Sequence, residues 1–178
     1  MTIEKLLPGN TFPAMQVPNI NGGTLSLGSA KAPHDWQLVI VYRGKHCPLC
    51  SRFLSELNES LSSFNELGVD VVAVSADSQD KAQAQVEPLQ LQFEVGYGLT
   101  IEQMQALGLF ISHPRSAEEA DRPFAEPGAF IVNESGQVQI TSISNVPFIR
   151  PHLPSLLAGL GFIRDPKNNY PIRGTYID

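Results

Sequence analysis

The chain has 178 residues, of which 42% are apolar and 17% are charged, and its formal net charge is −6 at pH 7. Its length suits one domain with a hydrophobic core, over residues 1–178. The negative net charge and the lack of any Lys/Arg cluster argue against a nucleic-acid-binding surface. No run approaches the roughly 20 apolar residues of a membrane span, and the N-terminus lacks the apolar core of a signal peptide. We therefore expect a cytoplasmic protein with no membrane partner.

The first half of the chain predicts a strand, a helix and a second strand. Residues 38–42 form a continuous apolar run, as in a strand buried on both faces. From Pro48 to Phe64 apolar residues recur every three or four positions, which predicts an amphipathic helix that Gly68 ends. Residues 69–74 are a second buried strand, so the three elements make a βαβ unit with a right-handed crossover.

The remaining segments predict shorter elements and one long loop. In chain order they are an extended piece at 24–27 after Pro/Gly turns, a helix at 79–90 capped by Ser78, a short strand at 93–97, a helix from Thr100 to Gly108, a polar loop at 111–127, a hairpin of 129–132 and 138–143, and a helix at 153–163. The polar tail, 165–178, leaves open whether it is mobile or packs on a partner chain.

Cys47 and Cys50 are the only cysteines, and their Cys-x-x-Cys spacing at a strand–helix junction is typical of a dithiol redox centre. If the helix begins at Pro48, Cys47 is its N-cap and Cys50 its third residue, with Cα atoms near disulfide distance. The partial positive charge of the helix N-terminus favours thiolate over thiol. One cysteine can then attack a disulfide or a peroxide, and the other can resolve the intermediate.

The cysteine pair allows three other interpretations. The two side chains could simply pack, or they could belong to a zinc site, which needs four ligands. A redox-sensing protein is the third, in which the state of the dithiol sets the packing of residues 111–127. The histidines do not favour zinc, because they are scattered and form no His-x3–5-His pair (His34, His46, His113 and His152). We expect neither a metal nor an organic cofactor.

The sequence resembles the AhpC/TSA, peroxiredoxin-like branch of the thioredoxin-fold superfamily over nearly its whole length. The resemblance is carried by the segments 8–13, 23–27, 41–50, 72–77 and 130–136. It implies an α/β thioredoxin-like fold, with a central mixed sheet, helices on both faces and an N-terminal β-hairpin extension. It also implies a thiol-dependent antioxidant oxidoreductase that reduces hydroperoxides or protein disulfides. A thiol donor such as a thioredoxin or glutathione system would restore the dithiol. The resemblance leaves open whether the protein forms a homodimer.

The match departs from typical peroxiredoxins at the site itself. Cys50 falls on the peroxidatic position, but Cys47 replaces a Thr or Ser and Arg43 replaces a Pro. The second active-site arginine of the family is missing from residues 126–128. By analogy, Arg43 or Arg122 would have to substitute for it.

Arg43, His46 and Pro127 are the candidate supporting residues around the dithiol. Arg43 could support the active-site loop or bind a carboxylate, and His46 could tune the pKa of Cys47 or shuttle protons. Pro127 occupies the place of the cis-proline of thioredoxin-like oxidoreductases, so we predict a cis-Pro127 that faces the dithiol. Thioredoxin logic makes Cys47 the attacking residue and peroxiredoxin logic makes it Cys50. Cap geometry favours Cys47 as the more exposed of the two.

Overall fold

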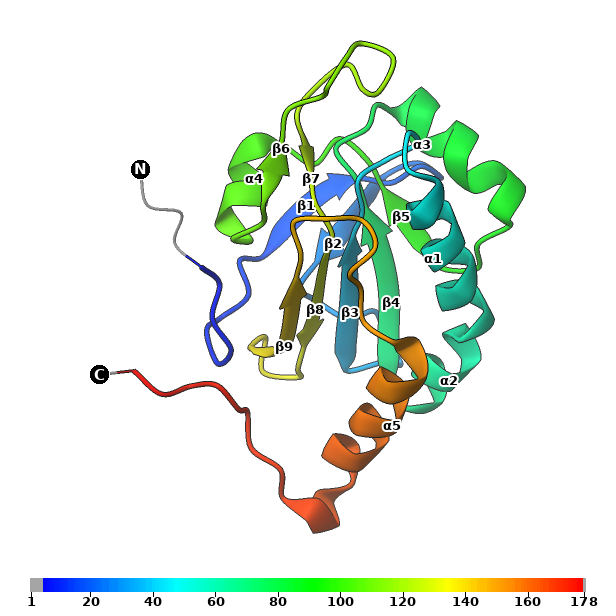
Figure 1. The fold of residues 1–178 in the computed structure, drawn as a ribbon. Helices are drawn as coiled ribbons and strands as arrows, with labels where there is room; N and C mark the ends of the chain where they lie inside the picture. The colour runs from blue at the N-terminus through cyan, green and yellow to red at the C-terminus, as the bar shows by residue number, and fades with distance from the viewer. Residues whose placement is uncertain (1–4, 178) are drawn as a thin grey trace.

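The computed structural model describes residues 5–177, which are built around a five-stranded mixed sheet (Figure 1). The strand order is β5-β4-β3-β8-β9, and β8 and β9 run antiparallel to their neighbours while β3, β4 and β5 are parallel. The predicted fold class is confirmed. The strands are β3 (Trp36–Val41), β4 (Val69–Val74), β5 (Glu94–Gly96), β8 (Gly128–Val132) and β9 (Val138–Ile143).

The central strand β3 is buried on both faces, as its continuous apolar sequence predicts. Because side chains alternate along a strand, Leu38 and Ile40 enter one core and Val39 and Val41 enter the other. The first core is covered by helices α1 (Pro48–Glu59), α2 (Leu61–Glu66) and α5 (Leu153–Arg164), with Val86 at the end of α3 (Gln79–Val86). The second is covered by α4 (Ile101–Ala106) and the hairpin of β1 (Met15–Pro18) and β2 (Thr24–Leu27).

Three elements differ from the prediction. The helix predicted from Pro48 to Phe64 is divided at Ser60, whose hydroxyl donates a hydrogen bond to the Glu56 carbonyl at 3.0 Å and so competes with the helical pattern. The helix predicted at 79–90 ends at Val86, and a 3-10 turn, Glu87–Leu89, follows because Pro88 lacks an N–H. The 111–127 loop is partly ordered, since β6 (Ile111–Ser112) pairs with β7 (Phe124–Ala125).

Two segments meet at the C-terminal end of β3. Residues 42–47 lead from β3 into α1, and residues 144–152, which connect β9 to α5, cross in front of the sheet (Figure 1). After α5 the chain makes a 3-10 turn, Pro166–Asn168, and then runs without regular structure to residue 177. No helix within residues 5–177 is long and apolar enough to span a bilayer.

Candidate redox site

Cys47 and Cys50 are joined by a disulfide at the N-terminus of α1, with their Cα atoms 5.3 Å apart. Cys47 is the N-cap and Pro48 the first helical residue, as the sequence predicts. The backbone N–H of Cys50 donates to Cys47 Sγ at 3.2 Å, so a sulfur takes the place of the usual capping oxygen. Their Cα separation lies in the range of disulfide-bonded cysteines.

Both cysteines are buried, with 2% of Cys47 and 0% of Cys50 exposed. Cys47 is thus only marginally the more exposed of the two, and neither sulfur is open to solvent as a helix N-cap alone would leave it. The physical reason is the β9–α5 connection, residues 144–152, which brings a side chain over the sulfur atoms that a helix N-terminus alone would leave open.

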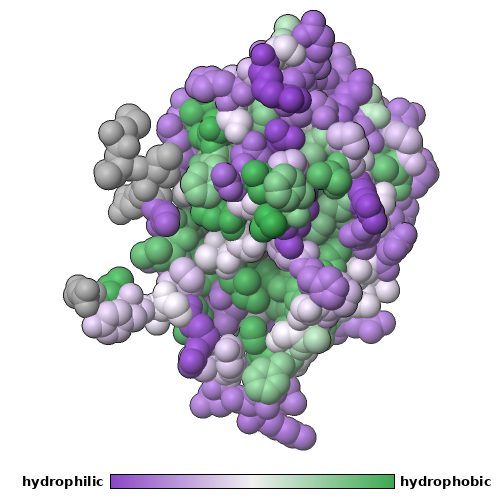
Figure 2. Space-filling view, in the orientation of Figure 1, coloured by the Kyte–Doolittle hydropathy of each residue, from purple (hydrophilic) through white to green (hydrophobic). Residues whose placement is uncertain are grey.

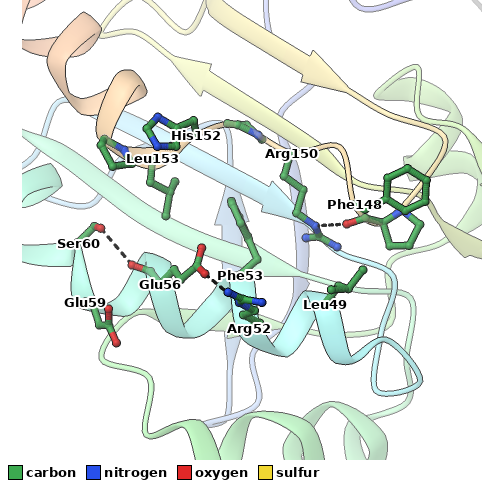
Figure 3. A pocket seen from close by; sticks show the side chains of 13 residues that line it. Leu49, Arg52, Phe53, Glu56, Glu59, Ser60, Phe148, Arg150, His152 and Leu153 are labelled. Atoms are coloured by element: carbon green, nitrogen blue, oxygen red, sulfur yellow. Dashed lines mark hydrogen bonds and ion pairs between the residues drawn. The ribbon is translucent and has the colours of Figure 1, made fainter.

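That side chain is Arg150, which was not among the predicted site residues. Its Nη2 lies 2.7 Å from Cys50 Sγ and 3.9 Å from Cys47 Sγ, within donor distance of both. Its Nε donates to the Pro147 carbonyl at 2.7 Å, and its guanidinium lies 5.1 Å above the centre of the Phe53 ring (Figure 3). Within residues 5–177 no carboxylate forms an ion pair with it. Burial, and secondarily the charge of Arg43, lower the pKa of Arg150 to about 10, so it is a cation at neutral pH.

Arg43 is engaged by acidic side chains instead. Its Nε lies 3.0 Å from the buried Oε2 of Glu126, its Nη2 lies 3.9 Å from Glu119, and its guanidinium lies 4.9 Å above the Phe124 ring. The other oxygen of Glu126 accepts the Ser112 hydroxyl at 2.7 Å. Arg43 therefore ties the loop before the cysteines to the 111–127 segment.

His46 lies against the same aromatic ring, with 4.4 Å between the centroids of His46 and Phe124. Burial, and then the charge of Arg43, lower its pKa below the ordinary 6.5, so the imidazole is neutral at neutral pH. Its Nε2 is buried without a hydrogen-bond partner in the part of the chain that the structure describes.

The cis bond predicted for Pro127 is wrong. The one cis peptide among residues 5–177 is Ala32–Pro33, so the Glu126–Pro127 bond is trans. The chain continues from β7 directly into β8 through this proline, and an extended path of that kind needs no reversal at Pro127. Its side chain borders a small cavity together with Phe53 and Arg150.

Asp77, at the end of β4, supports the loop that precedes the cysteines. Its Oδ2 accepts the Lys45 backbone N–H at 2.7 Å, and its carboxylate lies directly beneath Gly44. Gly44 has φ +135°, which residues with a side chain rarely adopt. The Ser75 hydroxyl accepts the Asp77 N–H at 3.3 Å. Ser75 and Asp77 thus act as turn and capping residues for this loop.

Arg122, the other arginine suggested by analogy, pairs with Asp121, with Nε and Oδ1 2.9 Å apart. The guanidinium at the sulfurs thus belongs to neither suggested residue. Arg150 lies 100 residues after Cys50, so no motif spacing could indicate it. The one available signal is that Arg150 is the only charged residue in the stretch 144–151.

A groove of about 630 Å³ opens beside the disulfide, between α1 and residues 147–154 (Figure 3). Its floor includes Phe53, and Arg52 pairs with Glu56 at 3.3 Å along its α1 wall. Apolar side chains gather where the β9–α5 connection crosses the sheet (Figure 2). Leu49, Phe148 and Ile149 are 42%, 69% and 60% exposed.

The described residues contain no group of three or more His, Cys, Asp or Glu side chains placed to hold a metal ion.

Comparison with known families places the whole fold and not the individual site residues. The sequence model of the AhpC/TSA family matches residues 8–141, well over half of the chain. The chain belongs to the AhpC/TSA family. The predicted resemblance is thereby confirmed, and this AhpC/TSA protein carries its second cysteine only three residues from the first.

Two Mycobacterium tuberculosis proteins provisionally named peroxiredoxins, MT2597 and Rv2521, are 27% identical to this AhpC/TSA protein over 77 residues. That alignment covers 43% of the chain and 48% of each relative, so the chain spans about half the length of the curated relatives it matches. Among solved structures, a peroxiredoxin-like protein from Aquifex aeolicus has a TM-score of 0.73 at 20% identity, covering 89% of this chain and 88% of that one. Mycobacterium tuberculosis AhpC has a TM-score of 0.72 at 19% identity, covering 92% and 96%. These likenesses establish the thioredoxin-like fold.

Proposed function

We propose that this AhpC/TSA protein is a thiol peroxidase that reduces hydroperoxides through Cys47 and Cys50. The observation that carries the proposal is a buried Cys47–Cys50 disulfide with a guanidinium, Arg150, against its sulfurs. The AhpC/TSA family match and the relatives named as peroxiredoxins also support a peroxidase reaction.

The reaction balances with the two cysteines and an external thiol. The thiolate of one cysteine attacks a peroxide oxygen and the O–O bond breaks; with uptake of the proton that the thiol had released, the products are a sulfenic acid and the alcohol or water. The thiol of the other cysteine condenses with the sulfenic acid, forming the disulfide and a second water. Two equivalents of an external thiol, from a thioredoxin or glutathione system, then reduce the disulfide by exchange.

Burial of the sulfurs favours a small oxidant. A hydroperoxide needs only a narrow opening to reach a thiolate, whereas a protein disulfide must bring a chain segment and its sulfur into line with the attacking atom. With 2% and 0% of the two cysteines exposed, the first route needs the smaller displacement of the 144–152 connection.

The groove beside the disulfide favours thiol–disulfide exchange with a protein as a second candidate function. Leu49 and Phe148 line this groove and offer exposed apolar contact area, as a site for an extended peptide would. The same groove could seat the protein that donates electrons to a peroxidase. The two functions differ in which substrate is reduced, a hydroperoxide or a protein disulfide.

Stopped-flow mixing of the reduced protein with hydrogen peroxide tests the proposal. Loss of free thiol should be rapid in the wild type, and a single oxidation should persist in only one of the variants Cys47→Ser and Cys50→Ser. Addition of a thiol donor should give repeated turnover, whereas a redox sensor would change state once. Thiol loss no faster than that of a free small thiol would overturn the peroxidase proposal and leave disulfide exchange.

A further inference from the structure

We propose that the groove between α1 and residues 147–154 docks an extended segment of a partner protein, with the partner's cysteine at the Arg150 end and a basic residue at the Glu59 end. This docking site rests on the proposed function in one respect, namely that a thiol from outside reduces the Cys47–Cys50 disulfide. Its position in the groove fixes which end receives the thiol and which charge the partner carries.

One end of the groove reaches the side chain that covers the disulfide. Arg150 lines the groove, and its Nη2 lies 2.7 Å from Cys50 Sγ and 3.9 Å from Cys47 Sγ. Leu49 and Phe148 lie at the same end and offer apolar area to a peptide side chain next to the partner's cysteine (Figure 3). Because both cysteines of this chain are buried, docking must shift the Arg150 side chain before the incoming thiol meets the disulfide.

One face of α1 forms the long wall of the groove. Leu49 and Glu59 lie at its opposite ends (Figure 3). At 1.5 Å per helical residue, the distance between them along the helix is about 15 Å. An extended chain covers that distance with about five residues, at about 3.3 Å each. The side chains of the wall recur every three or four positions, as neighbours on one helix face do: Leu49, Arg52, Phe53, Glu56, Glu59 and Ser60.

The two ends of the groove carry opposite charge. The Arg150 end adjoins the N-terminus of α1, which has a partial positive charge. At the other end Glu59 is the last residue of α1, and the last turn of this helix contains no basic residue to offset the partial negative charge of its C-terminus. Glu56 is paired with Arg52 at 3.3 Å, but Glu59 forms no ion pair within residues 5–177. A basic side chain of the partner complements this end.

The same polarity determines where the partner's thiol lies. The attacking species in thiol–disulfide exchange is a thiolate, an anion that the positive end attracts. Its sulfur bonds to one cysteine sulfur as the S–S bond breaks, and the released sulfur takes up a proton. A second partner thiol then displaces the mixed disulfide, so Cys47 and Cys50 gain two electrons and the partner leaves as a disulfide. A basic residue that faces Glu59 is therefore about four positions from the partner's cysteine.

Two pairs of blocked pentapeptides test the docking site with the full-length protein. Every peptide has a cysteine at one end, a leucine beside it and two glycines in the middle, and the members of a pair carry either lysine or glutamate at the far end. One pair begins with the cysteine and the other ends with it, so both chain directions are covered. The measurement is the second-order rate at which each peptide reduces the Cys47–Cys50 disulfide. Each rate is divided by the rate of the same peptide with oxidised glutathione, which removes differences in thiol reactivity.

In at least one pair the lysine peptide should be at least about threefold faster than the glutamate peptide at low ionic strength, a modest ratio because exposed ion pairs are weak. Salt should bring the ratio toward one. Glu59→Gln should lower the ratio, and the combination of Glu59→Gln with Glu56→Gln should lower it further. Glu102→Gln is the matched control and should retain the wild-type ratio, because Glu102 is exposed on α4 and does not line the groove.

A ratio of one for both pairs with the wild-type protein would overturn the proposal. So would a ratio that persists when Glu56 and Glu59 are both replaced by glutamine. Reduced glutathione that acts as fast as the lysine peptide would assign the groove to small thiols instead. A dimer that Phe148→Ser dissociates, together with a ratio of one, would assign it to a second copy of this chain.

No peroxide enters these measurements, so the docking site and the peroxidase fail separately. Discrimination between the peptides by a protein that does not consume peroxide would refute the peroxidase and support the docking site. Fast peroxide consumption by a protein that does not discriminate between the peptides would do the opposite.

Discussion

The carboxylate of Asp77 accepts the backbone N–H of Lys45 at 2.7 Å, and so ties the end of β4 to the loop that leads into the cysteines. Asp77 is buried, so this bond is made in a site with little water to replace it. The position of the disulfide thus depends on a residue from the neighbouring strand.

Asp77→Asn should lower the free energy of unfolding by about 1–3 kcal/mol, because a buried bond from an amide to a charged acceptor is replaced by a weaker one. Urea unfolding of the oxidised protein measures the loss. Asp80→Asn, an exposed carboxylate in the first turn of α3, is the control and should change stability much less. Equal losses in the two variants would contradict the role given to Asp77.

Gly44→Ala should destabilise the same loop. At φ +135° an added Cβ would lie 2.7 Å from Asp77 Oδ2, and the backbone conformation is itself strained for alanine, by about 1–3 kcal/mol. Gly98→Ala is the matched variant, because Gly98 also has positive φ, +68°, but a Cβ there would meet no atom within 4 Å. The midpoint of urea unfolding should fall further for Gly44→Ala, and a larger fall for Gly98→Ala would count against the close approach.

His46 should make the protein less stable as the pH falls. Its pKa in the folded protein lies below the unfolded value of about 6.5, so the unfolded state takes up the proton first. Stability is therefore fully present above about pH 6.5 and is lost as the pH falls toward the folded pKa. His46→Gln should flatten this decline in urea midpoints measured between about pH 7 and pH 5. The exposed His113→Gln should leave the decline as it is, and an unchanged slope in His46→Gln would contradict the prediction.

Phe148→Ser should slow the reduction of the disulfide by a protein donor such as thioredoxin, by about tenfold, because one large apolar contact is lost from the groove. Reduction by dithiothreitol, which is too small to use the groove, should be unaffected. Phe162→Ser on α5 is the control, since Phe162 is also exposed but does not line the groove. If both donors slow equally in Phe148→Ser, the groove is not the donor site.

Local sequence was sufficient for the elements whose side chains repeat with a clear period. The buried runs in β3 and β4 and the cap at Cys47 and Pro48 are decided by neighbours within a few positions. The division of the first helix at Ser60 was missed because a single hydroxyl competes with the backbone there while the apolar period continues past it. The family resemblance, rather than periodicity, supplied the sheet topology.

Of the site residues, the sequence predicted the two cysteines and their immediate neighbours but not the residues that contact them. Cys47 and Cys50 follow from spacing, and Arg43 and His46 follow from adjacency, but their partners Glu126 and Phe124 come from a segment about 80 residues later. Arg150 could not be predicted, because only the three-dimensional path of residues 144–152 brings it over the sulfurs. The cis-Pro127 prediction failed because it was transferred from a fold relative and not from the residues around Pro127.

The path of that connection matters for the choice of a minimal fragment. The family match ends at residue 141, whereas Arg150 and the core residues Leu153 and Leu160 of α5 follow it. A protein trimmed to the matched boundaries would keep both cysteines and lose the cover over them. Its sulfur atoms would be exposed to water and to alkylating reagents, and two trimmed molecules would exchange disulfides with each other. Its chemistry would no longer represent that of the full chain. Shared boundaries within the family are therefore a poor guide to where this reactive unit stops.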